Sequence, residues 1–88
     1  MNVKLSNGFE FTARDDLGDN MELLEALVAI DRDEEPAALS DAVRLIFGDY
    51  KKELYDACRA EDGRVPVTSI MEAINETLDQ IGEAGKKS

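Results

Sequence analysis

One short acidic segment of this sequence comes close to a chemical motif: residues 61–65, EDGRV. It resembles the middle of an EF-hand calcium loop, where a glycine follows an acidic ligand and a β-branched residue comes two positions later. With Gly63 as the sixth loop position, the first would be Cys58 and the twelfth Ser69. Neither is a carboxylate, and the bidentate glutamate of such loops is missing. The segment is therefore predicted to be a turn between two helices, without calcium.

The single cysteine, Cys58, is the other residue that could do chemistry. A cysteine nucleophile is usually activated by a base such as histidine, and the chain has no histidine. One cysteine without histidine also leaves no zinc ligand set of the usual kinds. Cys58 is therefore predicted to be a small buried apolar residue of a helix. No metal and no cofactor is expected.

The 20 Asp and Glu residues could supply a carboxylate pair for acid–base catalysis. Such pairs need burial or a close like charge to separate their pKa values. The densest acidic runs, residues 15–16 and 33–35, lie in segments that are predicted to be solvated loops. A glycine-rich phosphate loop followed by lysine is missing too. We therefore expect a protein that is not an enzyme.

The composition limits the classes of partner. The chain has 88 residues, enough for a single domain, and a net charge of −10. That charge disfavours nonspecific binding to nucleic acid and to anionic membranes, which carry the same sign. No run approaches the roughly 20 apolar residues of a membrane span, and no signal peptide is recognised. With one cysteine and therefore no internal disulfide, we expect a reduced, cytosolic protein that binds neither nucleic acid nor membranes.

Residues 1–14 are predicted to form a β-hairpin, because apolar and polar residues alternate on both sides of Asn7-Gly8. A two-residue loop at this turn would mix apolar and charged side chains on each face. A three-residue loop, residues 6–8, with Gly8 in the left-handed conformation, separates them. The predicted pairs are Val3 with Phe11 and Leu5 with Phe9 on the apolar face, and Lys4 with Glu10 on the other.

About four short helices are predicted to follow, giving a mainly α domain with the hairpin packed on them. Their predicted ranges are 21–30, 37–47, 50–60 and a last helix from near Thr68 or Ser69 to Gly82. The helical part is thus residues 19–82, and residues 83–88 are expected to be a frayed basic tail. Residues 15–19 are predicted to be a connector.

Caps and apolar stripes support these ranges. The predicted caps are Asp19 or Asn20 before the first helix, Gly48 after the second, Asp49 before the third and a Ser69–Glu72 capping box for the fourth. The predicted core-facing stripes are Leu23, Leu24, Leu27, Val28 and Ile30; Leu39, Ala42, Val43, Ile46 and Phe47; Tyr50, Leu54, Ala57 and Cys58; and Val67, Ile70, Ile74, Leu78 and Ile81.

Three large side chains are candidates for binding a partner: Phe47, Tyr55 and Met71. Tyr50 and Tyr55 are five residues apart and cannot both lie on one narrow helix stripe. If Tyr50 packs inward, Tyr55 points elsewhere and can join an exposed apolar patch. The alternative, left open here, is that a domain with few aromatic residues uses all of them in its core.

Several segments, in their order along the chain, are similar to those of a known family. They are residues 7–11 (NGFEF), 20–25 (NMELLE), 45–48 (LIFG), 51–56 (KKELYD), 61–67 (EDGRVPV) and 85–88 (GKKS). This layout resembles the small tail assembly chaperones of long, flexible-tailed (siphovirus-type) phages and prophages of Gram-positive bacteria. The resemblance covers nearly the whole chain, and its motifs are structural rather than chemical.

The resemblance implies a non-enzymatic protein of the infected host's cytoplasm that is absent from the finished virion. It would bind the tape measure protein, keep it soluble and recruit tail tube subunits during tail assembly. The charge of −10 leaves a second class open, a small acidic regulatory or inhibitory protein such as a nucleic-acid mimic. A mimic needs carboxylates spaced along one face, whereas here they are spread through loops and helices. A homo-oligomer is also left open, because a domain of this size gains from extra burial.

Overall fold

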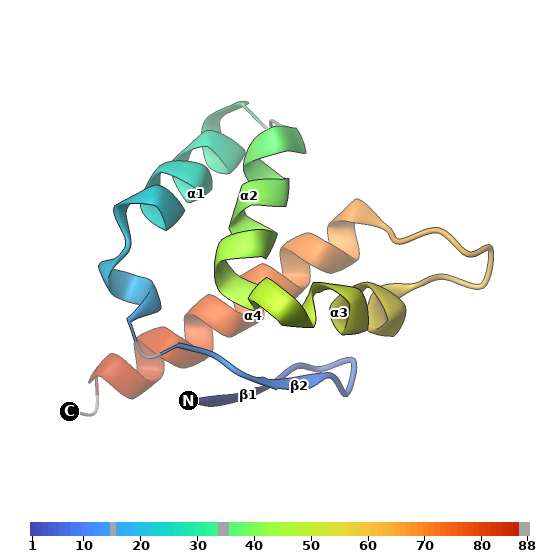
Figure 1. Ribbon diagram of the computed structural model, residues 1–88, viewed down its shortest axis with the longest axis horizontal. Helices are drawn as coiled ribbons and strands as arrows, with labels where there is room; N and C mark the ends of the chain where they lie inside the picture. The colour runs from blue at the N-terminus through green and yellow to red at the C-terminus, as the bar shows by residue number, and fades with distance from the viewer. Residues whose placement is uncertain (15, 34–35, 87–88) are drawn as a thin grey trace.

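The chain begins with a two-stranded antiparallel hairpin and continues as a set of helices (Figure 1). The computed structural model describes the backbone of residues 1–14, 16–33 and 36–86, and their side chains except at 33, 36 and 83–86. Its described elements are β1 (Asn2–Lys4), β2 (Glu10–Thr12), the 3-10 turn η1 (Leu17–Asp19), α1 (Met21–Asp33), α2 (Pro36–Phe47), the 3-10 turn η2 (Gly48–Tyr50), α3 (Lys51–Cys58) and α4 (Val67–Lys86). The predicted fold class, a small mainly helical domain with an N-terminal hairpin, is confirmed.

The hairpin has the predicted three-residue register. Val3 pairs with Phe11, and Lys4 pairs with Glu10. The amide of Leu5 donates to the carbonyl of Phe9 at 2.8 Å, which closes the loop. Gly8 has a φ of 93°, the left-handed conformation that this loop length needs. Separation of the apolar from the charged face therefore decides the register, as the alternation predicted.

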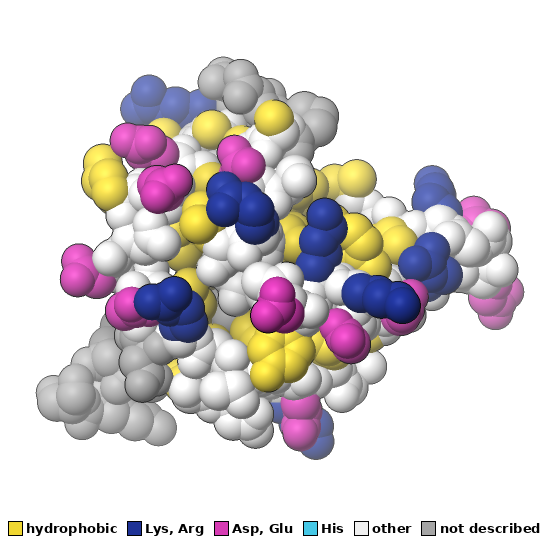
Figure 2. All heavy atoms as spheres, viewed as in Figure 1, with side chains coloured by type: hydrophobic (Ala, Val, Ile, Leu, Met, Phe, Trp, Pro, Cys, Tyr) yellow, Lys and Arg dark blue, Asp and Glu magenta, His cyan; other side chains and the backbone are white. Residues whose placement is uncertain are grey.

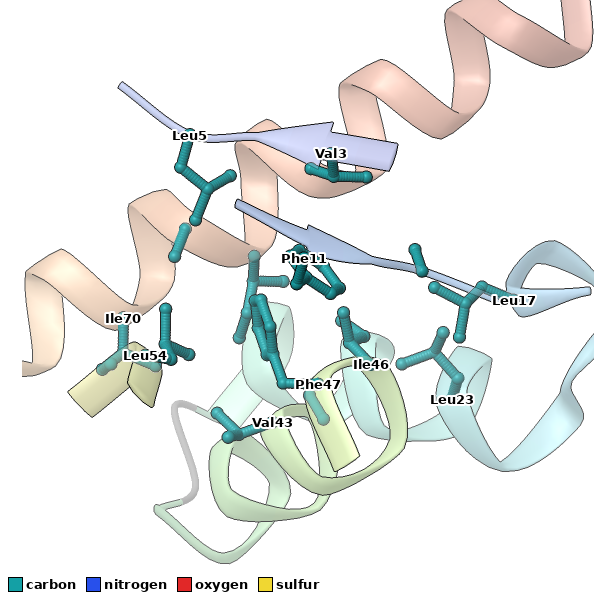
Figure 3. Packing of buried hydrophobic residues seen from close by; sticks show 14 of the residues in the cluster. Val3, Leu5, Phe11, Leu17, Leu23, Val43, Ile46, Phe47, Leu54 and Ile70 are labelled. Carbon is teal, nitrogen blue, oxygen red and sulfur yellow. The ribbon is translucent and has the colours of Figure 1, made fainter. Parts of the chain in front are cut away.

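The apolar face of the hairpin covers the helices. Figure 3 shows Phe11 of β2 and Phe47 of α2 pointing toward each other, and their ring centroids are 4.9 Å apart. The hairpin is also held on α4 by polar contacts. The side-chain amide of Gln80 donates to the carbonyl of Lys4 at 2.8 Å, and the amide of Ser6 donates to Glu76 at 3.1 Å. The hairpin thus closes the core against α2 and α4.

The start of α1 is capped by Asn20, as predicted. Its side-chain oxygen accepts from the amides of Glu22 at 3.0 Å and Leu23 at 3.3 Å. The connector before it is more ordered than predicted, because it contains η1 and buries Leu17; residue 15 lies outside the described residues. The end of α1 lies at Asp33, beyond the predicted end at residue 30.

The predicted core stripe of α1 is partly wrong. Leu23 is buried, but Leu24 and Val28 are exposed, and the buried neighbour of Leu23 on this helix is Ala26. α1 packs mainly on α2. Small residues lie between these two helices, among them Ala26, Ala29, Ala37 and Ala38. Alanines allow a close approach of the two helices.

The junction between α2 and α3 also differs from the prediction. Gly48 does end α2, with a φ of 53°. Asp49 does not cap the next helix, because η2 intervenes and α3 begins at Lys51 without a side-chain cap. Of the predicted third stripe only Leu54 and Cys58 are buried, whereas Tyr50 and Ala57 are exposed.

The last helix, α4, is longer than predicted at both ends. It begins at Val67, so Ser69 lies inside the helix and the predicted capping box is wrong. It also continues through Gly82 to Lys86, where a frayed tail was predicted; residues 87–88 lie outside the described part. Ile70 and Ile74 are buried and Leu78 and Ile81 are half-buried, as the stripe predicted, but Val67 is 60% exposed.

Candidate partner-binding trough

Three hollows that share lining residues lie beside one another between α1 and α4, and together they are called the trough. The first has a volume of about 600 Å³ and is lined by Ile30, Leu39, Ser40, Val43, Tyr55, Val65, Val67, Thr68, Ile70 and Met71. The second, of about 350 Å³, is lined by Leu27, Ile30, Asp31, Leu39, Met71, Ile74, Asn75 and Leu78. The third, of about 340 Å³, is lined by Leu17, Gly18, Asp19, Asn20, Met21, Leu23, Leu24, Leu27 and Leu78. Shared walls join them, since Ile30, Leu39 and Met71 line the first two, and Leu27 and Leu78 line the last two.

Two helix faces make the long walls of the trough. On α4 the lining positions 67, 70, 71, 74 and 78 follow helical spacing and lie on one face. On α1 the positions 23, 24, 27 and 30 do the same. Because α1 packs mainly on α2, its outer face is separated from α4 by the trough. Tyr55 of α3 and residues 65–67 close the first hollow at one end.

Large apolar side chains of the trough are exposed to solvent. Met21 and Leu24 are exposed in the third hollow, and Val67 and Met71 in the first. Figure 2 shows hydrophobic surface where α2, α3 and the start of α4 meet, with Lys and Arg side chains beside it. Contiguous exposed apolar surface of this kind marks interaction sites in soluble domains.

Two of the three predicted partner-binding residues lie in the trough. Tyr55 is half-buried and Met71 is 36% exposed, and both line the first hollow. Phe47 does not belong to the site: it is only 1% exposed and packs against Phe11 in the core. The hairpin covers Phe47, so this residue lies in the core, which is the alternative that the sequence left open. Tyr55 and Met71 line the same hollow because α3 packs against α4.

The sequence predicted Leu24 and Val67 as core residues, whereas both are exposed at the trough. One signal was available in the sequence. The α1 segment carries more large apolar residues than one neighbouring helix can cover: Leu23, Leu24, Leu27, Val28 and Ile30. Such a surplus on a helix at the edge of a small domain indicates either a further neighbour or an exposed binding face.

The charges of the trough are unevenly distributed. Asp19 and Asp31 lie along its α1 side. At the other end, the Lys51 ammonium lies 5.5 Å from the centroid of the Tyr55 ring, within cation–π distance. Carboxylates therefore border the α1 side of the trough, and the Lys51 ammonium lies at its Tyr55 end.

The Cys58 thiol is buried, as predicted. Burial raises its pKa above the ordinary value; a hydrogen bond from the Asn7 side chain opposes the shift, and the charge of Glu72 adds to it. The donor nitrogen of Asn7 is 3.5 Å from the sulfur. A raised pKa keeps the sulfur as a neutral thiol, the opposite of an activated nucleophile.

The segment 61–65 forms the predicted turn. The amide of Gly63, whose φ is 89°, donates to the carbonyl of Ala60 at 2.9 Å. Asp62 accepts from the amide of Arg64 at 3.0 Å, and the guanidinium of Arg59 donates to the carbonyl of Gly63 at 2.7 Å. The Asp62 carboxylate therefore stabilises the turn by accepting a backbone hydrogen bond. Among the described residues, no three Asp, Glu, Cys or His side chains lie close enough together to hold a metal ion.

Comparison with protein family models, curated proteins and solved structures finds no match to this chain. None of the helices described here combines the length and the apolar character needed to cross a membrane. The structural observations that bear on function are therefore the trough and the charge of the chain.

Proposed function

We propose that this chain is a phage tail assembly chaperone, a non-enzymatic protein that binds the tape measure protein and recruits tail tube subunits. It acts in the host bacterial cytoplasm and does not become part of the mature virion. The observation that carries the proposal is the largely apolar trough between α1 and α4, on a domain with a net charge of −10. The two partners, the tape measure protein and the tail tube protein, are inferred from the resemblance of the sequence to such chaperones.

The trough suits a helical partner. Tape measure proteins, as the family resemblance implies, are long coiled helical chains with apolar stripes that aggregate when left exposed. An amphipathic helix binds in an apolar groove through residues at i, i+3, i+4 and i+7. Each 100 Å² of apolar surface removed from water contributes about 2.5 kcal/mol before the costs of association. Exposed Met71 is well suited to such a wall, because methionine adapts to irregular partner surfaces.

The acidic surface supplies the second half of the mechanism. Like charges on the outer faces of neighbouring complexes repel each other, and this repulsion keeps the complexes soluble. The chain therefore masks the partner's apolar stripe and at the same time adds charge to it. Escort of the partner is driven by binding alone.

Copurification tests the proposal. The chain is coexpressed with the tape measure protein and the tail tube protein of the same genome, and then captured by an affinity tag. We expect the tape measure protein to copurify, and the substitution Met71→Glu to reduce its recovery. Val28→Glu is the matched control, because Val28 is also an exposed apolar residue but lies outside the trough. Recovery of neither partner with the unmodified chain contradicts the proposal.

A further inference from the structure

We infer that the trough binds a single amphipathic helix that carries basic residues on the side facing α1. The inference rests on the trough of the proposed function, but it concerns the chemistry of the bound segment and not the identity of its protein. It follows from the shape of the trough, from the placement of its charges and from the net charge of the chain.

The shape favours one helix. Along α4 the trough extends from Val67 to Leu78, eleven residue steps. At 1.5 Å a residue this is about 17 Å, or roughly three helical turns. The opposite wall is the outer face of α1, which is also a helix face. Two helical walls with an apolar floor fit a third helix by the usual packing of side-chain ridges into grooves.

The acidic residues beside the trough favour a bound helix with basic residues on its polar flank. Asp19 and Asp31 are acidic residues on the α1 side, and among the side chains that the structure describes, no Lys or Arg lines any of the three hollows. A helix in the trough would bring its polar flank beside these carboxylates, where Lys or Arg is favoured and Asp or Glu is disfavoured. Lys51 lies at the far end, beside Tyr55, so the preference for basic residues belongs to the α1 side.

The net charge disfavours the simplest alternative occupant, a second copy of this chain. Each copy carries −10, so two copies repel each other, whereas a basic segment is attracted from a distance. The occupant is therefore a segment of a different protein, with an apolar stripe and a basic border.

Two synthetic peptides of about 18 residues test the inference. They share one stripe of leucines at i, i+3, i+4 and i+7 and differ only in having Lys or Glu at the positions that flank it. Binding to the full chain is measured by fluorescence anisotropy at low salt, and the site is located by amide chemical shifts. We expect the Lys peptide to bind at least about tenfold more tightly than the Glu peptide. Its shifts should lie in α1 and α4.

Two pairs of variants separate the trough from the general charge of the protein. Val67→Glu should weaken binding of the Lys peptide by about tenfold or more, as loss of an anchoring contact does. Val28→Glu adds the same charge outside the trough and should change binding by less than about twofold. Glu is favoured near a helix N-terminus, so Val67→Glu should fold, and circular dichroism checks this. Met71→Glu changes a second residue of the α4 wall and should weaken binding of the Lys peptide in the same way.

The acidic side is tested by Asp31→Asn against Asp49→Asn, which removes the same charge outside the trough. We expect Asp31→Asn to weaken binding of the Lys peptide about two- to fivefold, as for an exposed ion pair, and Asp49→Asn to have little effect.

Equal binding of both peptides, no binding of the Lys peptide, or equal effects within either variant pair would overturn the inference. If the tape measure protein copurifies but the Lys peptide does not bind, the inference fails and the proposed function stands. The reverse result rejects the proposed function alone.

Discussion

Phe47 and Met71 are both large apolar residues of the helical part, but they differ in what surrounds them. Phe47 is 1% exposed and is covered by Phe11, whereas Met71 is 36% exposed at the wall of the trough. The sequence could not separate them, since both fall at helical positions that suit either a core or a binding face. Their exposure predicts opposite effects of truncation.

We expect Phe47→Ala to lower the free energy of unfolding by about 3–5 kcal/mol, because it leaves a cavity at the centre of the core. We expect Met71→Ala to lower it by about 1 kcal/mol or less, while reducing binding of the partner. Urea denaturation measures the first quantity and copurification measures the second. A Phe47→Ala variant that keeps its stability but loses the partner would return Phe47 to the binding site.

Gly48 and Gly82 have different roles in the helices, because one ends a helix and the other lies inside one. Gly48 ends α2 with a φ of 53°, and Gly82 lies inside α4. A Cβ built at either position meets no atom within 4 Å, so only the backbone conformation decides the effect of adding one. A side chain at a left-handed position costs about 1–2 kcal/mol, whereas Ala in a helix interior is about 0.5–1 kcal/mol better than Gly.

We therefore expect Gly48→Ala to destabilise the domain by about 1–2 kcal/mol and Gly82→Ala to stabilise it by about 0.5–1 kcal/mol. Urea or thermal denaturation of the two variants measures both signs in the same background. Stabilisation by Gly48→Ala would mean that α2 and η2 do not meet as described. A loss of stability in Gly82→Ala would mean that α4 ends at residue 82, as the sequence alone predicted.

Elements defined by local pattern were predictable from the sequence, and elements defined by packing were not. The register of β1 and β2 follows from alternation and a turn, which are both local. The core face of α1 was misjudged because its contact with α2 uses alanines, and a pattern of large residues gives these little weight. The Ser69–Glu72 capping box failed because α4 begins at Val67, directly after Pro66. The trough depends on how far α1 lies from α4, and no local pattern encodes that distance.

The whole molecule is thin, and its thinness accounts for the exposed apolar surface. Its extents are 42 × 29 × 19 Å. A helix with its side chains is about 10–12 Å across, so the short dimension holds roughly two layers of elements. In such a domain, the hairpin and the helices share one core. Among the described elements, none forms a third layer over the outer faces of α1 and α4 (Figure 1). A bound helix would supply that layer, which links the fold directly to the proposed binding function.

The net charge of −10 acts on the folded chain as well as on its partners, and salt should separate the two effects. Self-repulsion destabilises a compact acidic domain, and exposed ion pairs such as Arg59–Asp56 at 3.3 Å contribute little against it. Raising NaCl from about 0.05 to about 0.5 M shortens the Debye length to roughly 4 Å and screens the repulsion. We expect the Tm to rise by a few degrees, since about 1 kcal/mol corresponds to roughly 4–8 °C in a domain of this size.

The double variant Asp49→Asn, Glu53→Gln is the control for this effect, because it changes the net charge from −10 to −8 at exposed positions. Its Tm should respond less to the same salt, as measured by circular dichroism. A Tm that falls with salt would show that attractive ion pairs outweigh the repulsion. Binding of the basic peptide should change in the opposite direction, because salt screens attraction between unlike charges. A Tm that rises with salt while binding weakens would show that the net charge both destabilises the folded chain and attracts the basic partner.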